Sequence, residues 1–144
     1  MAQITVVAVT SAAQMKLAHA IRRAVFIEEQ HVPEDIELDA ADADAFHALA
    51  MSGGVAIGCG RMVAYPDSQV KIGRMAVARE HRKSGVGREI LHFLMNEARA
   101  RGIRSAVLDA QLTAEGFYLK NGFAPVGEVF EEAGILHRKM TRAL

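Results

Sequence analysis

A chain of 144 residues, of which 51% are hydrophobic, is long enough to bury one sizeable core, and we expect a single domain over residues 1–144. Equal numbers of acidic and basic residues give no net charge, which argues against a nucleic-acid partner. No apolar run reaches the ~18–20 residues of a membrane span, and Met1–Ile4 lacks the basic region of a secretory leader, so we expect a cytoplasmic protein without membrane contact.

The acidic residues are unevenly distributed. All eight Asp and Glu residues of the first 60 positions fall between Glu28 and Asp44, whereas residues 61–144 hold fourteen Lys and Arg residues. This division would suit an anionic cofactor that meets a cationic substrate at the acidic segment. A solvated acidic loop that serves only solubility is an equal alternative.

The first half of the sequence predicts a strand, a long helix and two further strands. Ser11 is a suitable N-cap, and apolar residues then recur at helical spacing through Phe26. Pro33 ends any continuation, so the acidic segment that follows is predicted to be a loop or a broken helix. The expected elements are a strand at Ile4–Val9, a helix from Ser11 to about Gln30, and strands at Ala45–Met51 and Val55–Ala64.

The second half predicts two strands joined by a helix, then a short helix and two final strands. The expected elements are a strand at Val70–Ala78, a helix from about Gly85 to Arg101, a strand at Ile103–Asp109, a helix at Thr113–Lys120, and strands at Phe123–Phe130 and Ile135–Arg142. This order predicts an α/β (α+β) fold in which one right-handed βαβ crossover lies within an otherwise antiparallel sheet.

The loop before the central helix has the sequence Arg82-Lys83-Ser84-Gly85-Val86-Gly87 and is followed by Arg88. Backbone N–H groups at a helix start, together with the positive end of the helix dipole, form a site for anions. Gly85 and Gly87 let a phosphate approach without a Cβ in the way, and three cations surround it. The loop therefore predicts a polyphosphate ligand.

Known glycine motifs argue against two classes of polyphosphate site, so a nucleotide-binding protein is only a distant alternative. The string G-x-x-x-x-G-K-[ST] does not occur, and the dinucleotide string G-x-G-x-x-G would need a third glycine and a place in the first strand–helix turn. A strand followed by R-x-x-G-x-G resembles instead the pyrophosphate loop of the GNAT superfamily of acyl-CoA-dependent N-acetyltransferases. The order of elements resembles the GNAT fold over essentially the whole sequence. This resemblance implies a mixed, mostly antiparallel sheet of about seven strands, with a splayed parallel pair and flanking helices.

The resemblance also implies a cosubstrate, acetyl-CoA. In this family pantetheine enters the gap of the splayed pair, where it would be bound by the backbone of Met75, Ala76 and Val77. The physical basis is sound, because a splayed pair leaves N–H and C=O groups unpaired and pantetheine is rich in amides.

A second segment, Ala114–Phe123, is similar to the family string A-x-x-F-Y-x-x-x-G-F. It implies that Phe117 and Lys120 contact the cofactor and that Tyr118 gives a proton to the departing CoA thiolate. A phenol is protonated at neutral pH and can donate to developing negative charge. An ordinary half-buried tyrosine is the alternative.

A third segment, Ile21–Pro33 with Ala45–Ala50 after it, is similar to the small ElaA-like or YjcF-like predicted N-acetyltransferases of bacteria. Many relatives have Asn at the end of the parallel strand, where this protein has Asp109. That carboxylate could serve as a base, although capping the following helix is the more economical role.

These resemblances imply direct transfer of an acetyl group to an amine of a small molecule or peptide. Cys59, the only cysteine, lies in a predicted strand with no visible base, which disfavours a covalent intermediate and excludes a disulfide. A base must take the amine proton. Glu29 is the first candidate because it ends the first helix, where the acceptor site of the family opens; Glu28, His47 and Asp109 are alternatives.

Other interpretations are left open. The protein could be a non-catalytic acyl-CoA-binding or regulatory module, or it could transfer a longer acyl group or use a hydroxyl acceptor. His81 is expected to be structural or to face the cofactor, and no HExxH or CxxC pattern predicts a metal. The final two strands could pair across a homodimer.

Overall fold

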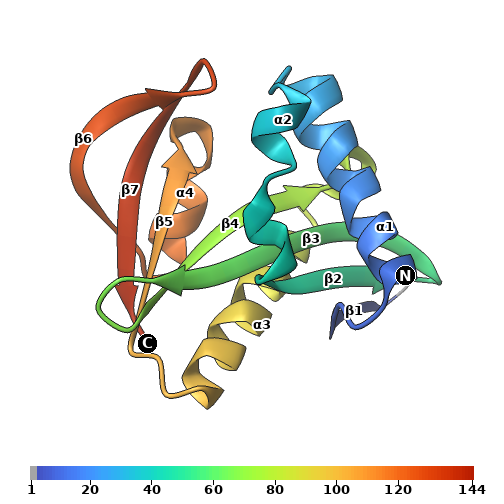
Figure 1. The fold of residues 1–144 in the computed structure, drawn as a ribbon, viewed down its shortest axis with the longest axis horizontal. Helices are drawn as coiled ribbons and strands as arrows, with labels where there is room; N and C mark the ends of the chain where they lie inside the picture. The colour runs from blue at the N-terminus through green and yellow to red at the C-terminus, as the bar shows by residue number, and fades with distance from the viewer. Residues whose placement is uncertain (1–2) are drawn as a thin grey trace.

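The computed structural model of the protein describes residues 3–144; Met1 and Ala2, part of the segment in which no leader is expected, lie outside this range. Within it, seven strands form one sheet in the order β1-β2-β3-β4-β5-β7-β6 (Figure 1). Every neighbouring pair is antiparallel except β4 and β5, which confirms the predicted fold class. The strands are β1 (Ile4–Ala8), β2 (Phe46–Ser52), β3 (Val55–Tyr65), β4 (Gln69–Val77), β5 (Ser105–Gln111), β6 (Ala124–Glu132) and β7 (Ile135–Ala143).

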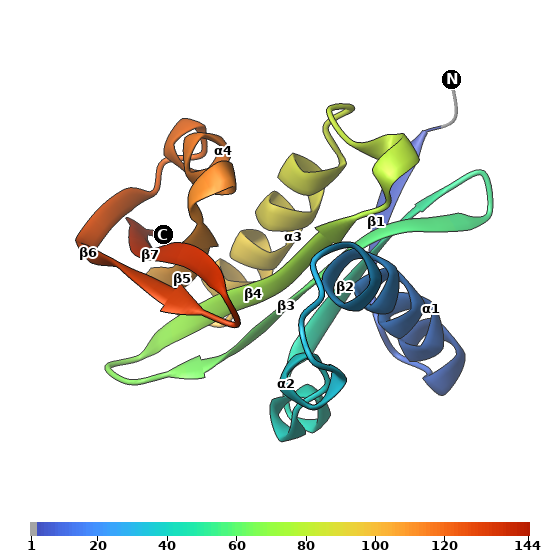
Figure 2. The same ribbon diagram turned by 90° about the horizontal axis from the view of Figure 1, so that it is seen from above.

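Helices cover both faces of the sheet: α1 lies against one face, with α2 beside it, and α3 lies against the other (Figure 2). The helical segments are α1 (Ala12–Arg22), η1 (Arg23–Glu29), α2 (Glu34–Glu37), η2 (Ala40–Ala43), η3 (Arg79–His81), α3 (Val86–Ala100), η4 (Leu112–Ala114) and α4 (Glu115–Lys120). No helix within residues 3–144 is both long and apolar enough to cross a membrane. In the same range no three His, Cys, Asp or Glu residues are placed to hold a metal ion.

The amphipathic pattern of α3 builds the larger of two cores. Its buried side chains, at three- and four-residue spacing, are Val86, Ile90, Leu91, Leu94, Met95 and Ala98. Gly102, with φ +78°, follows the helix end as predicted. Ile103 N–H then donates a hydrogen bond back to Ala98 C=O at 3.0 Å. A smaller core lies between the opposite face of the sheet and the side chains of α1 and η1.

The first helix differs from its predicted form. Ser11 caps it, as expected, by accepting a hydrogen bond from Gln14 N–H at 3.2 Å, but the α-helix ends at Arg22. Residues 23–29 continue as the π-helix η1, in which the hydrogen bond from Gln30 N–H to Val25 C=O, at 3.2 Å, spans five residues. The spacing of the apolar residues fits both helix types, so the sequence did not reveal the wider turn.

β5 begins two residues later than predicted. Ile103 N–H is hydrogen-bonded to the last turn of α3, and Arg104 C=O accepts a hydrogen bond from Leu144 N–H at 2.8 Å. The strand starts only at Ser105. Asp109 therefore lies inside the strand rather than at its end. The predicted capping role of Asp109 is wrong, because Gln111 occupies the N-cap position of the helical turn that follows.

The acidic segment is held against the sheet by arginines. Glu37, which is 2% exposed, pairs with Arg22 at 2.8 Å and with Arg74 at 3.0 Å. Arg22 Nη2 also donates to the backbone C=O of Glu37 at 2.7 Å. These contacts join α2 to both α1 and β4, and the two arginines balance the charge of the buried Glu37 carboxylate.

Two further carboxylates complete this network. Asp42 accepts hydrogen bonds from Arg22 and Arg61, each at 2.8 Å, and Asp39 pairs with Arg61 at 2.7 Å. Burial alone would raise the pKa of Asp42, but the hydrogen bonds from the two arginines lower it to about 2. Three acidic residues of the segment are therefore paired with arginines against the sheet, whereas four of its eight are exposed. The segment forms the short helical turns α2 and η2, in line with the predicted broken helix, and its encounter with a cationic substrate stays a prediction.

The network predicts a large effect of Arg22→Ala on stability. Glu37 would stay buried but lose a charged partner, so we expect the free energy of unfolding to fall by ~3–5 kcal/mol, measured by urea denaturation. Arg23→Ala is the matched control, because the side chains of Arg23 and its partner Glu34 are 46% and 58% exposed. Its loss should stay below ~1 kcal/mol, and equal losses in the two variants would contradict a buried network.

Candidate active site

β4 and β5 are paired only where they begin. The parallel register is Gln69↔Ser105, Val70↔Ala106 and Lys71↔Val107, and it then stops. β4 stays paired with β3 as far as Val77, and β5 stays paired with β7 as far as Gln111, so the two halves of the sheet diverge (Figure 1). The predicted splayed pair is confirmed, and backbone groups on the facing edges are available to a ligand.

An ion pair joins the two strands where their pairing stops. Lys71 Nζ lies 2.9 Å from Asp109 Oδ2. Lys71 is in the last paired position of β4, whereas Asp109 lies two residues past Val107, its partner on β5. Asp109 Oδ1 is buried and has no hydrogen-bond partner among residues 3–144. Asp109 thus lies at the closed end of the gap. One carboxylate oxygen is paired with Lys71, and the other is buried away from solvent.

β4 is irregular at Arg74, beyond the paired positions. The register with β3 shifts between Cys59 and Arg61, and Arg74 has φ +51°, a left-handed conformation that is costly for any residue other than glycine. Its guanidinium is fixed, because Nη2 donates to Ile36 C=O at 3.1 Å and Nε donates to Glu37 C=O at 3.2 Å. These contacts hold the bulge that bends β4 where it leaves β5.

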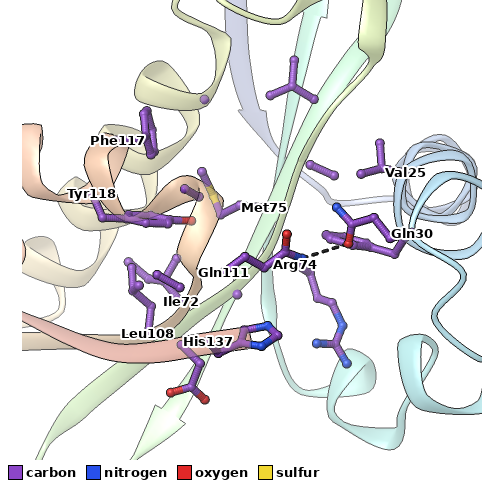
Figure 3. A pocket seen from close by; sticks show the side chains of 18 of the residues that line it. Val25, Gln30, Ile72, Arg74, Met75, Leu108, Gln111, Phe117, Tyr118 and His137 are labelled. Atoms are coloured by element: carbon purple, nitrogen blue, oxygen red, sulfur yellow. Dashed lines mark hydrogen bonds between the residues drawn. The ribbon is translucent and has the colours of Figure 1, made fainter. Parts of the chain in front are cut away.

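A cavity of about 1040 Å³ occupies the gap (Figure 3). Figure 3 shows Phe117 and Tyr118 on one side of it and Val25 and Gln30 on the other. The predicted site residues that line it are Met75, Ala76, Val77, Arg82, Lys83, Gly85, Val86, Gly87, Arg88, Asp109, Phe117 and Tyr118, and His81 lines it as well. The predicted residues that are not among its lining are Ser84, Lys120, Glu28, Glu29 and His47.

The loop before α3 fits a pyrophosphate. Gly85 is the N-cap residue, with φ +89°, and the first N–H groups of α3 have no acceptor within the helix. Arg82 Nε donates to Val77 C=O at 3.0 Å, which fixes the loop to the end of β4. A Cβ on Gly87 would lie 3.4 Å from Phe117 Cζ, in van der Waals contact, and would occupy space beside the start of α3. Backbone donors, cations and free space therefore meet at one point of the cavity.

Tyr118 directs its hydroxyl into the cavity (Figure 3). The residue is 8% exposed, and its ring is held by edge-to-face contacts, with centroid distances of 5.0 Å to Phe117 and 5.8 Å to Phe123. Burial raises the pKa of Tyr118 to about 12. The hydroxyl is consequently a hydrogen-bond donor throughout the range of pH in which proteins normally work.

Glu29, the first candidate for the base, pairs with arginines instead of facing the cavity. Its Oε1 lies 2.9 Å from Arg82 Nη2, and its Oε2 lies 3.6 Å from Arg79 Nη2. The hydrogen bond from Arg82 lowers the pKa of Glu29, which makes it a weaker base. His47 is buried, and its Nε2 lies 2.9 Å from Asp42 C=O. The geometry favours neither residue as the base.

Sequence reasoning missed the polar residues that lie across the cavity from Tyr118. Gln111 Nε2 donates to Gln30 Oε1 at 2.8 Å and so joins β5 to the end of η1 (Figure 3). Arg74 and His137 also line this part of the cavity. These residues come from four separate segments and share no motif, so only the fold brings them together.

The fold and this site define a class of protein. The sequence matches the acetyltransferase (GNAT) domain family over residues 7–144, and the chain therefore belongs to the GNAT acetyltransferase family. The uncharacterized N-acetyltransferase YjcF of Bacillus subtilis is 35% identical over 130 residues, which cover 90% of this chain and 92% of that protein. Protein ElaA of Escherichia coli is 32% identical over 136 residues, which cover 92% of this chain and 89% of that protein.

Solved structures share the fold. The crystal structure of Escherichia coli ElaA aligns over 99% of both proteins with a TM-score of 0.84 and 28% identity. A GNAT family acetyltransferase from Elizabethkingia anophelis, whose structure has acetyl-CoA bound, aligns over 98% of both proteins with a TM-score of 0.76 and 18% identity. The predicted resemblance to the GNAT superfamily and to ElaA-like and YjcF-like proteins is confirmed.

The burial of Tyr118 predicts a late ionisation. The sequence has two tyrosines, so in Tyr65→Phe the phenolate absorbance comes from Tyr118 alone. We expect its midpoint near pH 12, compared with ~10 for a free phenol. Because the folded pKa is the higher one, the stability due to the neutral phenol is complete below pH ~10 and is lost as the pH rises through about 12. A midpoint near 10 in the folded protein would show that the hydroxyl is hydrated.

Proposed function

We propose that the protein transfers an acetyl group from acetyl-CoA directly to an amine of a small molecule or peptide. The observation that carries the proposal is that one cavity joins the glycine loop of α3 to the buried side chain of Tyr118, along the unpaired edge of β4. The loop suits a pyrophosphate, the strand edge suits a series of amides, and the phenol suits a departing thiolate.

Acetyl-CoA would lie along β4. The N–H groups that open α3, with Arg82, Lys83 and Arg88, would hold its pyrophosphate, and the backbone of residues 75–77 would pair with pantetheine as an added strand. The acetyl-CoA in the Elizabethkingia anophelis structure, which has the same fold, supports this choice of ligand. Ser84 and Lys120 remain predicted cofactor contacts outside the cavity lining.

The reaction requires no covalent enzyme intermediate. The amine nitrogen attacks the thioester carbonyl carbon, the C–N bond forms, and the C–S bond breaks. Tyr118 would donate its proton to the thiolate that leaves. Cys59 offers no alternative nucleophile, because burial raises the pKa of its thiol to about 12 and keeps it in the unreactive form.

The acceptor end of the cavity carries balanced charge. Glu37 and Asp39 line it, but each is paired with Arg74, at 3.0 Å in both cases. Among residues 3–144, Glu132 is the lining carboxylate without a Lys or Arg partner, and its side chain is 58% exposed, so the lining offers little unpaired negative charge to a cationic acceptor. A cytoplasmic location and a homodimer formed through β6 and β7 stay predictions.

Gly85→Val should weaken the binding of acetyl-CoA, measured by isothermal titration. A branched side chain at φ +89° distorts the helix start and blocks phosphate approach, so we expect affinity to fall at least ~10-fold, or ~1.4 kcal/mol. Gly102→Val is the matched control, because Gly102 has φ +78° just after the other end of α3 and its Cβ would also meet no atom within 4 Å. It should lose similar stability and keep wild-type affinity. Retained affinity in folded Gly85→Val would refute the loop assignment.

Tyr118→Phe tests the transfer itself. The assay supplies acetyl-CoA and a panel of primary amines and detects the released CoA thiol. We expect kcat to fall ~10²–10³-fold while the Kd for acetyl-CoA is almost unchanged. Tyr65→Phe, outside the cavity lining, should leave both values as in the wild type. Wild-type turnover in Tyr118→Phe would remove its proposed role. Acetyl-CoA binding without acetylation of any amine would instead identify a non-catalytic binding module.

A further inference from the structure

His137 lines the same cavity as Tyr118, and one of its ring nitrogens is free of a structural role. Its Nδ1 lies 2.8 Å from Ile135 C=O. Because a carbonyl can only accept, Nδ1 carries the hydrogen, and the lone pair of a neutral ring is then on Nε2. Glu132 Oε2 is 3.9 Å from Nε2, which is beyond hydrogen-bond distance.

The surrounding structure holds this ring in place. It stacks on Phe130, with the centroids 5.7 Å apart and the planes at 20°, and its side chain is 10% exposed. The register of β5 and β7 sets His137 opposite Gln111, whose side chain reaches Gln30 at the end of η1. Figure 3 shows the ring beneath Gln111, on the part of the cavity wall that lies away from Phe117.

We infer that His137 is the base that takes a proton from the acceptor amine, an inference that rests on the proposed function. The acceptor enters as an ammonium ion, and Nε2 accepts one of its protons. The freed lone pair then attacks the thioester carbon, and the C–S bond breaks as the C–N bond forms. Tyr118 gives its proton to the thiolate and regains one from the new amide nitrogen. The imidazolium finally releases its proton to solvent, so one proton leaves for each amide formed.

All but one of the other carboxylates around the acceptor are paired with a lysine or an arginine; the exception is Glu132. Asp109 Oδ2 pairs with Lys71, and its Oδ1 is buried. The remaining charged side chains that line this part of the cavity are Glu37, Asp39, Arg61, Arg74 and Glu132. Of these, the two carboxylates of the acidic segment pair with arginines, and the side chain of Glu132 is 58% exposed. His81, the other imidazole of the lining, lies in η3 beside the loop that opens α3. His137 is much less exposed than Glu132 and keeps a free lone pair on Nε2, so it is better placed to take a proton from an amine inside the cavity.

His137→Asn isolates this role, because the asparagine amide can still donate to Ile135 C=O while no base remains. We would compare kcat/KM with the most active member of a panel comprising an aliphatic diamine, an amino sugar, an amino acid and a dipeptide. Near pH 7 we expect kcat/KM of the variant to be ~10²–10⁴-fold below that of the wild type, with an unchanged Kd for acetyl-CoA. The loss should shrink by up to ~10-fold per pH unit on approach to the pKa of a free amine, ~10, because the neutral amine then needs no base.

His92→Asn is the matched control, because His92 lies on α3 outside the cavity lining, with its Nε2 3.1 Å from Asn121 Oδ1; it should follow the wild-type profile. An active His137→Asn, or a loss of the same size at every pH, would overturn the inference and leave the proposed function intact. Acetyl-CoA binding without turnover of any amine by the wild type would overturn both. Nitrogen NMR of the wild-type ring gives a second test that needs no variant: a hydrogen on Nδ1 is expected, and a neutral ring with its hydrogen on Nε2 would refute the base assignment.

Discussion

The end of parallel pairing after Lys71 and Val107 is the constraint on which the rest of the structure depends. A continuous parallel sheet would consume its own backbone donors and acceptors and would leave no room between β4 and β5. Because pairing stops after three residues, the edge of β4 that faces the gap keeps free amide groups. The loop that opens α3 lies at one end of that edge, and Tyr118 lies across from it.

Keeping the strands apart costs free energy, because each buried N–H or C=O without a partner is unfavourable by ~1–3 kcal/mol. Several contacts offset this cost. The bulge at Arg74 bends β4, and the ion pair of Lys71 and Asp109 joins the strands at the narrow end of the gap. The core under α3 packs against the sheet face that α3 covers. The arginine network ties the α2 segment to β3 and β4, so charge pairs and the smaller apolar core together build this side of the cavity.

The local features of the site could be predicted from sequence. Glycine at 85 and 87, the periodicity of α3 and the string around Tyr118 are each determined by neighbours along the sequence, and the structure has them as expected. Asp109 was predicted to end β5, but it lies two residues before the strand end. The strand starts later than predicted because Ile103 still hydrogen-bonds to the last turn of α3. The π-helix η1 was not predicted because the spacing of its apolar residues fits an α-helix equally well. The pairing of the acidic segment depends on arginines of other elements, which no local pattern reports. His137 could not be recognised because its role depends on a hydrogen bond to Ile135 and on a cavity that only the folded sheet creates.

Hydrogen exchange, resolved by residue and compared with and without CoA, tests the central claim most directly. If the unpaired edge of β4 receives the ligand, CoA should slow exchange at amides within residues 73–77 and at those that open α3, while β1 and β2 stay unchanged. CoA binding that left both segments of the cavity unprotected, or that protected only surfaces remote from the gap between β4 and β5, would contradict the account.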